Sequence, residues 1–137
     1  MTCKRCISSL PILFLAALVG CQGSSPPPLP ATHAVSGTVV YKNGGPVVGR
    51  IKFQPVGGSS YLAEGILGKD GRFTLSTLRP GGEERIDGAP AGEYTVSVIP
   101  VMLKPVVSGG RPDIQLPDRV HVHEGENNFS FEISRKP

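Results

Sequence analysis

Residues 69–75 read Lys-Asp-Gly-Arg-Phe-Thr-Leu, and this short stretch contains the two signals that decide the fold. Asp70-Gly71 is typical of a tight hairpin turn, because both residues tolerate the positive φ that such a turn requires. After the turn, Phe73 and Leu75 alternate with polar residues, which is the period of two expected of a strand with one buried face. The stretch therefore predicts a β-hairpin whose second strand points Phe73 and Leu75 into a core.

The same alternation recurs on both sides of this hairpin, between Gly- and Pro-rich turns. Strands are predicted at 33–41, 50–55, 61–67, 73–76, 94–99, 120–123 and 129–133. Gly37 lies inside the first of them, which suggests a close approach of another backbone. Loops are predicted at 79–92 and 103–118. No segment from residue 33 onward has a helical period. The predicted fold class is therefore all-β, a seven-stranded antiparallel β-sandwich.

Length and charge restrict the function classes. The chain has 137 residues, which allows one domain and is too short for the large multi-layer enzyme folds. Its formal net charge is only +3, and no basic cluster exceeds two residues. A nucleic acid is therefore not expected as a partner.

The first 20 residues have the pattern of a secretory signal peptide. Lys4 and Arg5 precede an apolar run from Leu10 to Val19, which is too short to span a bilayer as a helix. The run ends in Leu18-Val19-Gly20-Cys21, which resembles the bacterial lipobox. This resemblance implies that Cys21 is the lipid attachment point: its thiol receives a diacylglyceryl group, the chain is cut before Cys21, and the new amine is acylated, with palmitate as the expected acid.

Lipidation at Cys21 carries expectations for the rest of the chain. Cys3 and Cys6 would be removed with the signal peptide, so the mature protein would contain no disulfide. The segment 21–32 would consist of the lipidated cysteine and a Pro-rich linker that extends from the membrane. The expected location is the cell envelope, facing the periplasm or the exterior. Gln22 rather than Asp after the cysteine favours the outer membrane over the inner one, as in other lipoproteins of this type.

Residues 33–134 resemble the carboxypeptidase regulatory-like domain, a transthyretin-like (prealbumin-like) β-sandwich. The resemblance rests on motifs that occur in order: Val35-Ser36-Gly37-Thr38-Val39, Gly45-Pro46-Val47, Ile51-Lys52-Phe53, Lys69 to Leu75, and Pro90-Ala91-Gly92-Glu93-Tyr94-Thr95-Val96-Ser97-Val98. With the lipobox and the closing Glu124 to Phe129, the chain is similar to small bacterial lipoproteins of the planctomycete type. These motifs consist of turn residues and core alternation, so they imply a fold and no activity.

The only cluster of potential metal ligands is His121-Val122-His123-Glu124. His121 and His123 would share one face of a strand and are weak candidates, with Glu126 or His33 as a third ligand. A zinc site needs three or four such ligands. Two histidines beside a turn are more simply explained as solvent-facing residues, so no cofactor is expected.

The sequence contains neither the Gly-x-Ser-x-Gly motif of serine hydrolases nor a phosphate-binding loop, and an enzyme is not expected. The first hypothesis is a membrane-anchored, non-catalytic structural or interaction module of the cell envelope, with an envelope protein or a polysaccharide as partner. The alternative is a surface lipoprotein that binds a glycan or a metal. Glycan sites favour exposed aromatic side chains, and the chain has no Trp; Tyr61 is the aromatic residue expected to be exposed. Oligomeric state is left open.

Overall fold

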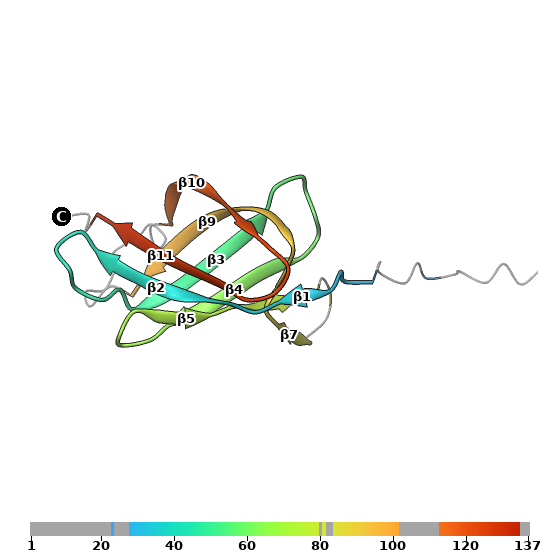
Figure 1. Cartoon of the computed structure of the whole chain (residues 1–137), viewed down its shortest axis with the longest axis horizontal. Helices are drawn as coiled ribbons and strands as arrows, with labels where there is room; N and C mark the ends of the chain where they lie inside the picture. Colours follow the sequence, from blue (N-terminus) through green and yellow to red (C-terminus); the bar gives the residue numbers. More distant parts are fainter. Residues whose placement is uncertain (1–22, 24–27, 80, 82–83, 102–112, 135–137) are drawn as a thin grey trace, which may run out of the picture.

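The computed structural model describes residues 23, 28–79, 81, 84–101 and 113–134, and this part of the chain is all-β without a helix (Figure 1). The strands are β1 (Thr32–His33), β2 (Val35–Tyr41), β3 (Gly49–Pro55), β4 (Leu62–Leu67), β5 (Arg72–Thr74), β6 (Ser76–Leu78), β7 (Arg85–Asp87), β8 (Ala89–Pro90), β9 (Gly92–Pro100), β10 (Ile114–Val122) and β11 (Asn127–Ile133).

Two sheets face each other across the core. One has six strands in the order β10-β9-β3-β4-β6-β7, and the other has three in the order β11-β2-β5. A separate pair, β1 with β8, joins the start of the described domain to the loop before β9. Figure 1 shows the three-stranded sheet in front of the larger one.

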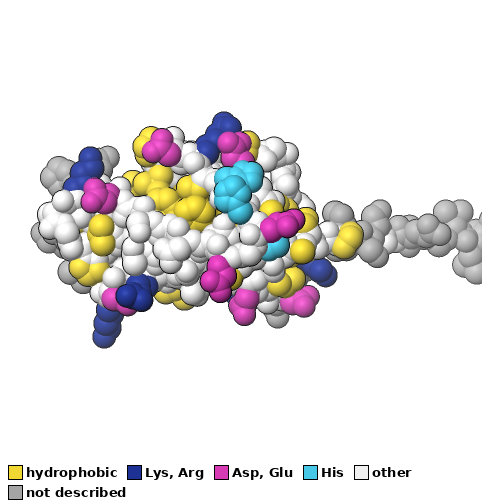
Figure 2. Space-filling model, in the orientation of Figure 1, with side chains coloured by type: hydrophobic (Ala, Val, Ile, Leu, Met, Phe, Trp, Pro, Cys, Tyr) yellow, Lys and Arg dark blue, Asp and Glu magenta, His cyan; other side chains and the backbone are white. Residues whose placement is uncertain are grey.

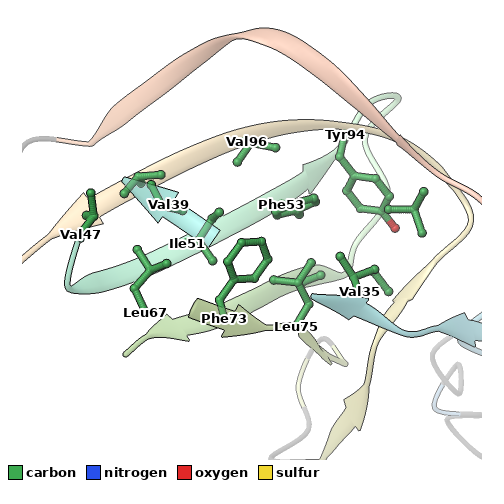
Figure 3. Packing of buried hydrophobic residues seen from close by; sticks show 14 of the residues in the cluster. Val35, Val39, Val47, Ile51, Phe53, Leu67, Phe73, Leu75, Tyr94 and Val96 are labelled. Atoms are coloured by element: carbon green, nitrogen blue, oxygen red, sulfur yellow. The ribbon is translucent and has the colours of Figure 1, made fainter. Parts of the chain in front are cut away.

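The core consists of the inward side chains of both sheets, as the alternation predicts. Phe53 of β3 lies at its centre and contacts the rings of Phe73, Tyr94, Phe129 and Phe131 at centroid distances of 5.8–6.2 Å. Figure 3 shows Phe53 between Phe73 and Tyr94, with aliphatic side chains on either side. Apolar side chains from both sheets therefore fill the space between them.

Most strand pairs are antiparallel, as predicted, but one is not. β11 pairs with β2 in parallel over its whole length, from Asn127 opposite Val35 to Ile133 opposite Tyr41. The prediction of an antiparallel sandwich is wrong for this pair. The chain crosses from one sheet to the other before β11, so the last strand runs in the direction of the first long one.

The strand boundaries also differ from the prediction. The segment 73–76 is interrupted at Leu75, where the chain passes from the three-stranded sheet (β5) to the six-stranded one (β6). The predicted loop 79–92 contains the short strands β7 and β8, and the last five residues of the predicted loop 103–118 begin β10. The rest of that loop lies mostly outside the described residues.

Gly37 and Gly71 have the roles expected of them. A Cβ at Gly37 would collide with the carbonyl oxygen of Phe129 and lie 2.9 Å from the ring of Phe73. The backbone that approaches Gly37 closely is therefore that of β11. Gly71 has a φ of 75° in the turn between β4 and β5. Asp70 accepts a hydrogen bond from Arg72 N at 3.1 Å and supports the same turn.

Candidate functional site

The lipid attachment site predicted at Cys21, with the lipobox residues Leu18, Val19 and Gly20, lies outside the described residues. What the structure provides is the position at which the chain enters the domain. β1 begins at Thr32, and its pairing with β8 fixes this entry at one end of the sandwich (Figure 1). In the described part of the chain, no helix is long and apolar enough to cross a membrane.

His121 and His123 lie side by side at the end of β10, as the strand period predicts. Their ring centroids are 4.6 Å apart and both side chains are exposed (Figure 2). His33, one of the two suggested third ligands, instead accepts a hydrogen bond at Nδ1 from the backbone N–H of Gly125 at 3.2 Å. Within the described residues, no group of three His, Cys, Asp or Glu side chains comes together. The histidines are thus a surface pair that flanks the β10–β11 turn.

Asn127 holds that same turn, and the sequence analysis did not single it out. Its side chain is 8% exposed, and its Oδ1 accepts a hydrogen bond from His123 N at 2.8 Å. Its Nδ2 donates to the carbonyl oxygens of His123 at 2.9 Å and Gly125 at 3.3 Å. A buried amide placed before a strand can replace the backbone partners that a turn lacks. The Glu-Asn-Asn sequence at the strand start is the only signal that could have indicated it.

Tyr94 is a second buried polar side chain with a defined partner. Its hydroxyl donates to the carbonyl oxygen of Pro90 at 2.7 Å, and the side chain is fully buried at the base of β9. Burial raises the pKa of the Tyr94 phenol well above its usual range, and the neighbouring Tyr61 raises it further. This phenol therefore stays protonated and fixes the loop that leads into β9. Tyr61, which was expected to be exposed, is instead partly buried.

The outer face of the three-stranded sheet is polar and nearly uncharged. Its cross-strand register places Asn128, Ser36 and Thr74 in one row, and Ser130, Thr38 and Arg72 in the next. Five of these six side chains are short and uncharged, and Arg72 is the one charged residue among them. We call these six residues the polar face. Figure 2 shows a broad area without charged side chains over β2 and β11.

The polar face forms the floor of an open groove of about 600 Å³. Asn128 Nδ2 donates to Ser36 Oγ at 3.3 Å, and the hydroxyls of Thr38 and Ser130 lie 3.5 Å apart. Ile66, which is 74% exposed, borders the groove on the side of β4. Hydroxyl and amide groups in such rows can form hydrogen bonds with polar groups of a ligand or of another protein surface.

Within the described residues, these observations define an all-β protein whose two sheets enclose an apolar core and whose smaller sheet exposes a polar face. No family model matches the sequence, and the comparisons with curated proteins and with solved structures found no match.

Proposed function

We propose that this chain is a membrane-anchored lipoprotein of the cell envelope, and that its β-sandwich is a non-catalytic structural or interaction module. The observation that carries the proposal is the Leu18-Val19-Gly20-Cys21 motif, which follows a cationic start and an apolar run. A single acyl chain gives only marginal membrane binding, whereas two or three chains on one cysteine anchor a protein stably.

The arrangement of the domain supports the same proposal. The first described strand begins at Thr32, and in this proposal the segment between Cys21 and that strand serves as the spacer. Four of the 11 residues from Gln22 to Thr32 are Pro, a composition that favours an extended conformation. Aromatic and aliphatic side chains pack the interior, and the groove over the polar face is shallow and open. Contact with another molecule at the surface fits this form better than chemistry in a deep site.

We further propose that the domain is a carboxypeptidase regulatory-like, transthyretin-like sandwich. The proposal rests on the resemblance of the sequence motifs, several of which occupy turns and strand starts. Asp70-Gly71 forms the turn between β4 and β5, and Gly92 begins β9, the strand next to the centre of the larger sheet. The parallel pair of β2 and β11 closes the smaller sheet around the first long strand.

Intact mass of the membrane-extracted protein tests the proposal. The wild-type chain should begin at Cys21 and carry the added mass of a diacylglycerol and one acyl chain, whereas Cys21→Ala should lack this mass and stay soluble or unprocessed. Cys6→Ala is the matched control, because it removes a thiol from the signal segment and leaves the motif intact; it should be lipidated like the wild type. A wild-type chain without lipid, or a Cys21→Ala chain that carries the same added lipid mass, would contradict the proposal.

A further inference from the structure

Among the residues that the structure describes, β11 is an edge strand, and one row of its backbone hydrogen-bonding groups has no partner strand. Asn127 N donates to Ala34 O at 2.9 Å, and Ile133 O accepts from Lys42 N at 3.0 Å, so these two residues direct their backbone groups toward the side of β2. Backbone groups alternate between the two edges along a strand. Asn128, Ser130 and Glu132 therefore direct their N–H and C=O groups to the free edge.

The other edge strands of the described sheets are blunted against pairing, and β11 is not. β10 contains Pro117 and an irregular register between Gln115 and Arg119, while β5 and β7 have only three residues each. Prolines, bulges and short length are the usual means of protecting a sheet edge. β11 has seven residues, no proline or glycine, and one charge, which is the composition of a segment that readily pairs with another strand.

Apolar surface accompanies this free edge. Phe129 and Phe131 of β11, together with Leu116 and Val120 of β10, pack against the core but are only partly buried. Figure 2 shows apolar side chains at the surface along the line between β10 and β11. A strand added to β11 would cover part of this surface, because alternate side chains of the new strand would point inward beside the two phenylalanines.

The sequence of β11 is complementary to itself when two copies are antiparallel. A register centred on Ser130 places Ser130 opposite Ser130, Asn128 opposite Glu132, and Phe129 opposite Phe131 of the second copy. Each Glu132 would then meet an amide rather than another carboxylate, and the aromatic residues would form cross-strand pairs on the inner face. A parallel arrangement would instead place the two Glu132 carboxylates side by side, which is unfavourable.

We propose that β11 pairs antiparallel with β11 of a second copy of this chain, centred on Ser130, so that the two three-stranded sheets become one continuous sheet. This names the partner of the interaction module proposed above and rests on that proposal. The contact is isologous, so it closes as a dimer and does not extend into a fibre. It would also join the two polar faces into one surface twice as wide. Anchoring to a common membrane would favour the dimer by confining both copies to one surface.

Cysteine crosslinking in membranes tests the register. The parent carries Cys3→Ala and Cys6→Ala, and three variants add Ser130→Cys, Asn128→Cys, or both Asn128→Cys and Glu132→Cys. Opposite residues that exchange hydrogen bonds have Cα atoms about 5.5 Å apart, which permits a disulfide. Two Asn128 residues would lie about four positions apart along the strands, roughly 13 Å.

Ser130→Cys and the double variant should form the disulfide-linked dimer under mild oxidation, with a yield at least about tenfold above that of Asn128→Cys and of the parent. Equal yields for Ser130→Cys and Asn128→Cys would overturn the proposal, because they would indicate random collision. A crosslink from Ser130→Cys to a different protein would also overturn it, since β11 would then pair with another partner.

Native mass of the detergent-extracted protein gives an independent test. The wild-type chain should be a dimer. Ser130→Pro should be a monomer with an unchanged circular dichroism spectrum, because its N–H faces the free edge and proline is tolerated there. Ser130→Ala is the matched control and should remain dimeric. A monomeric wild-type chain, or a dimeric Ser130→Pro chain, would refute the pairing.

The lipid mass, read on the same extract, distinguishes the two proposals. A lipidated monomer would refute the dimer alone, whereas an unlipidated dimer would refute the anchor alone.

Discussion

At the scale of single residues, the domain depends on a few buried polar side chains that fix its loops. Tyr94, Asn127 and Thr77 each form a hydrogen bond between a buried side chain and a backbone group of a turn or short strand. A buried carbonyl or amide without a partner costs about 1–3 kcal/mol of folding free energy. These side chains therefore contribute more to stability than the exposed ion pairs, such as Arg119 with Glu93, whose typical contribution is about 0–1 kcal/mol.

Tyr94→Phe isolates one of these bonds. The change keeps the ring in the core and removes only the hydroxyl that donates to Pro90 O, so it should lower the free energy of unfolding by about 1–2 kcal/mol. Urea unfolding followed by circular dichroism measures this loss. Thr95→Val is the matched control on the same strand, because the Thr95 hydroxyl is on the outer side and makes only a 3.4 Å contact with Gln54 O. A loss as large in Thr95→Val as in Tyr94→Phe would contradict the assignment.

Comparison of the wild type with Tyr94→Phe also gives a pH dependence of stability with a defined sign. The folded state raises the pKa of the Tyr94 phenol above its usual value of about 10. Between about pH 10 and the higher folded-state value, the unfolded chain therefore releases a proton that the folded chain retains. The free energy of unfolding of the wild type should fall with pH in that window by up to about 1.4 kcal/mol per unit more than that of Tyr94→Phe. If the free energies of unfolding of the wild type and Tyr94→Phe changed equally with pH, the Tyr94 phenol would have the same pKa in the folded and unfolded states.

At the scale of elements, the strands could be predicted largely from the sequence, whereas their partners could not. Period-two alternation identifies the inward residues of β2, β3, β9 and β11, because burial depends only on which face a side chain occupies. The same alternation holds for parallel and antiparallel neighbours, so it carries no information about the direction of β11 beside β2. Pairing depends on contacts between residues about 90 positions apart, such as Ser130 with Thr38.

The elements that were missed have identifiable reasons. β7 and β8 lie among Gly and Pro residues and are too short to show an alternation. The first half of β10 was not predicted because it contains Pro117, and a proline argues against a strand except at a sheet edge or a bulge. β10 is an edge strand and has an irregular register at this point. For the candidate site, the sequence indicated the paired histidines but not Asn127, whose role depends on a turn that only the folded chain defines.

The lipid attachment at Cys21 remains a prediction.

Gly37→Ala tests the close contact between β2, β5 and β11. A Cβ at this position would meet the Phe129 carbonyl oxygen and the Phe73 ring, so either β11 or the core must shift. The expected loss is about 2–4 kcal/mol in the free energy of unfolding, which is the upper range for overpacking. Gly45→Ala is the control, because its φ is not positive and the nearest atom would be 3.6 Å away; it should change stability by less than about 1 kcal/mol. Similar losses in both variants would argue against the close approach.

At the scale of the whole molecule, the two sheets depend on each other for burial. Phe53 belongs to the larger sheet, yet three of its four aromatic partners, Phe73, Phe129 and Phe131, come from the smaller one. A three-stranded sheet has one face to bury and cannot bury it without the opposite layer. The strands that carry the polar face are therefore held in place by the core on their opposite side, and any contact of this face with another molecule depends on that core.

Phe53→Ala should consequently destabilise both sheets together. Removal of this ring leaves a cavity between the layers and should cost about 3–5 kcal/mol. Because a domain of this size unfolds as one cooperative unit, hydrogen exchange should show amides of β2 and β9 losing protection by the same factor. Val56→Ala, at a side chain that is 39% exposed, should leave exchange in both strands within twofold of the wild type. If β9 lost protection while β2 kept it, the smaller sheet would be stable without its partner, and the polar face would not depend on this core.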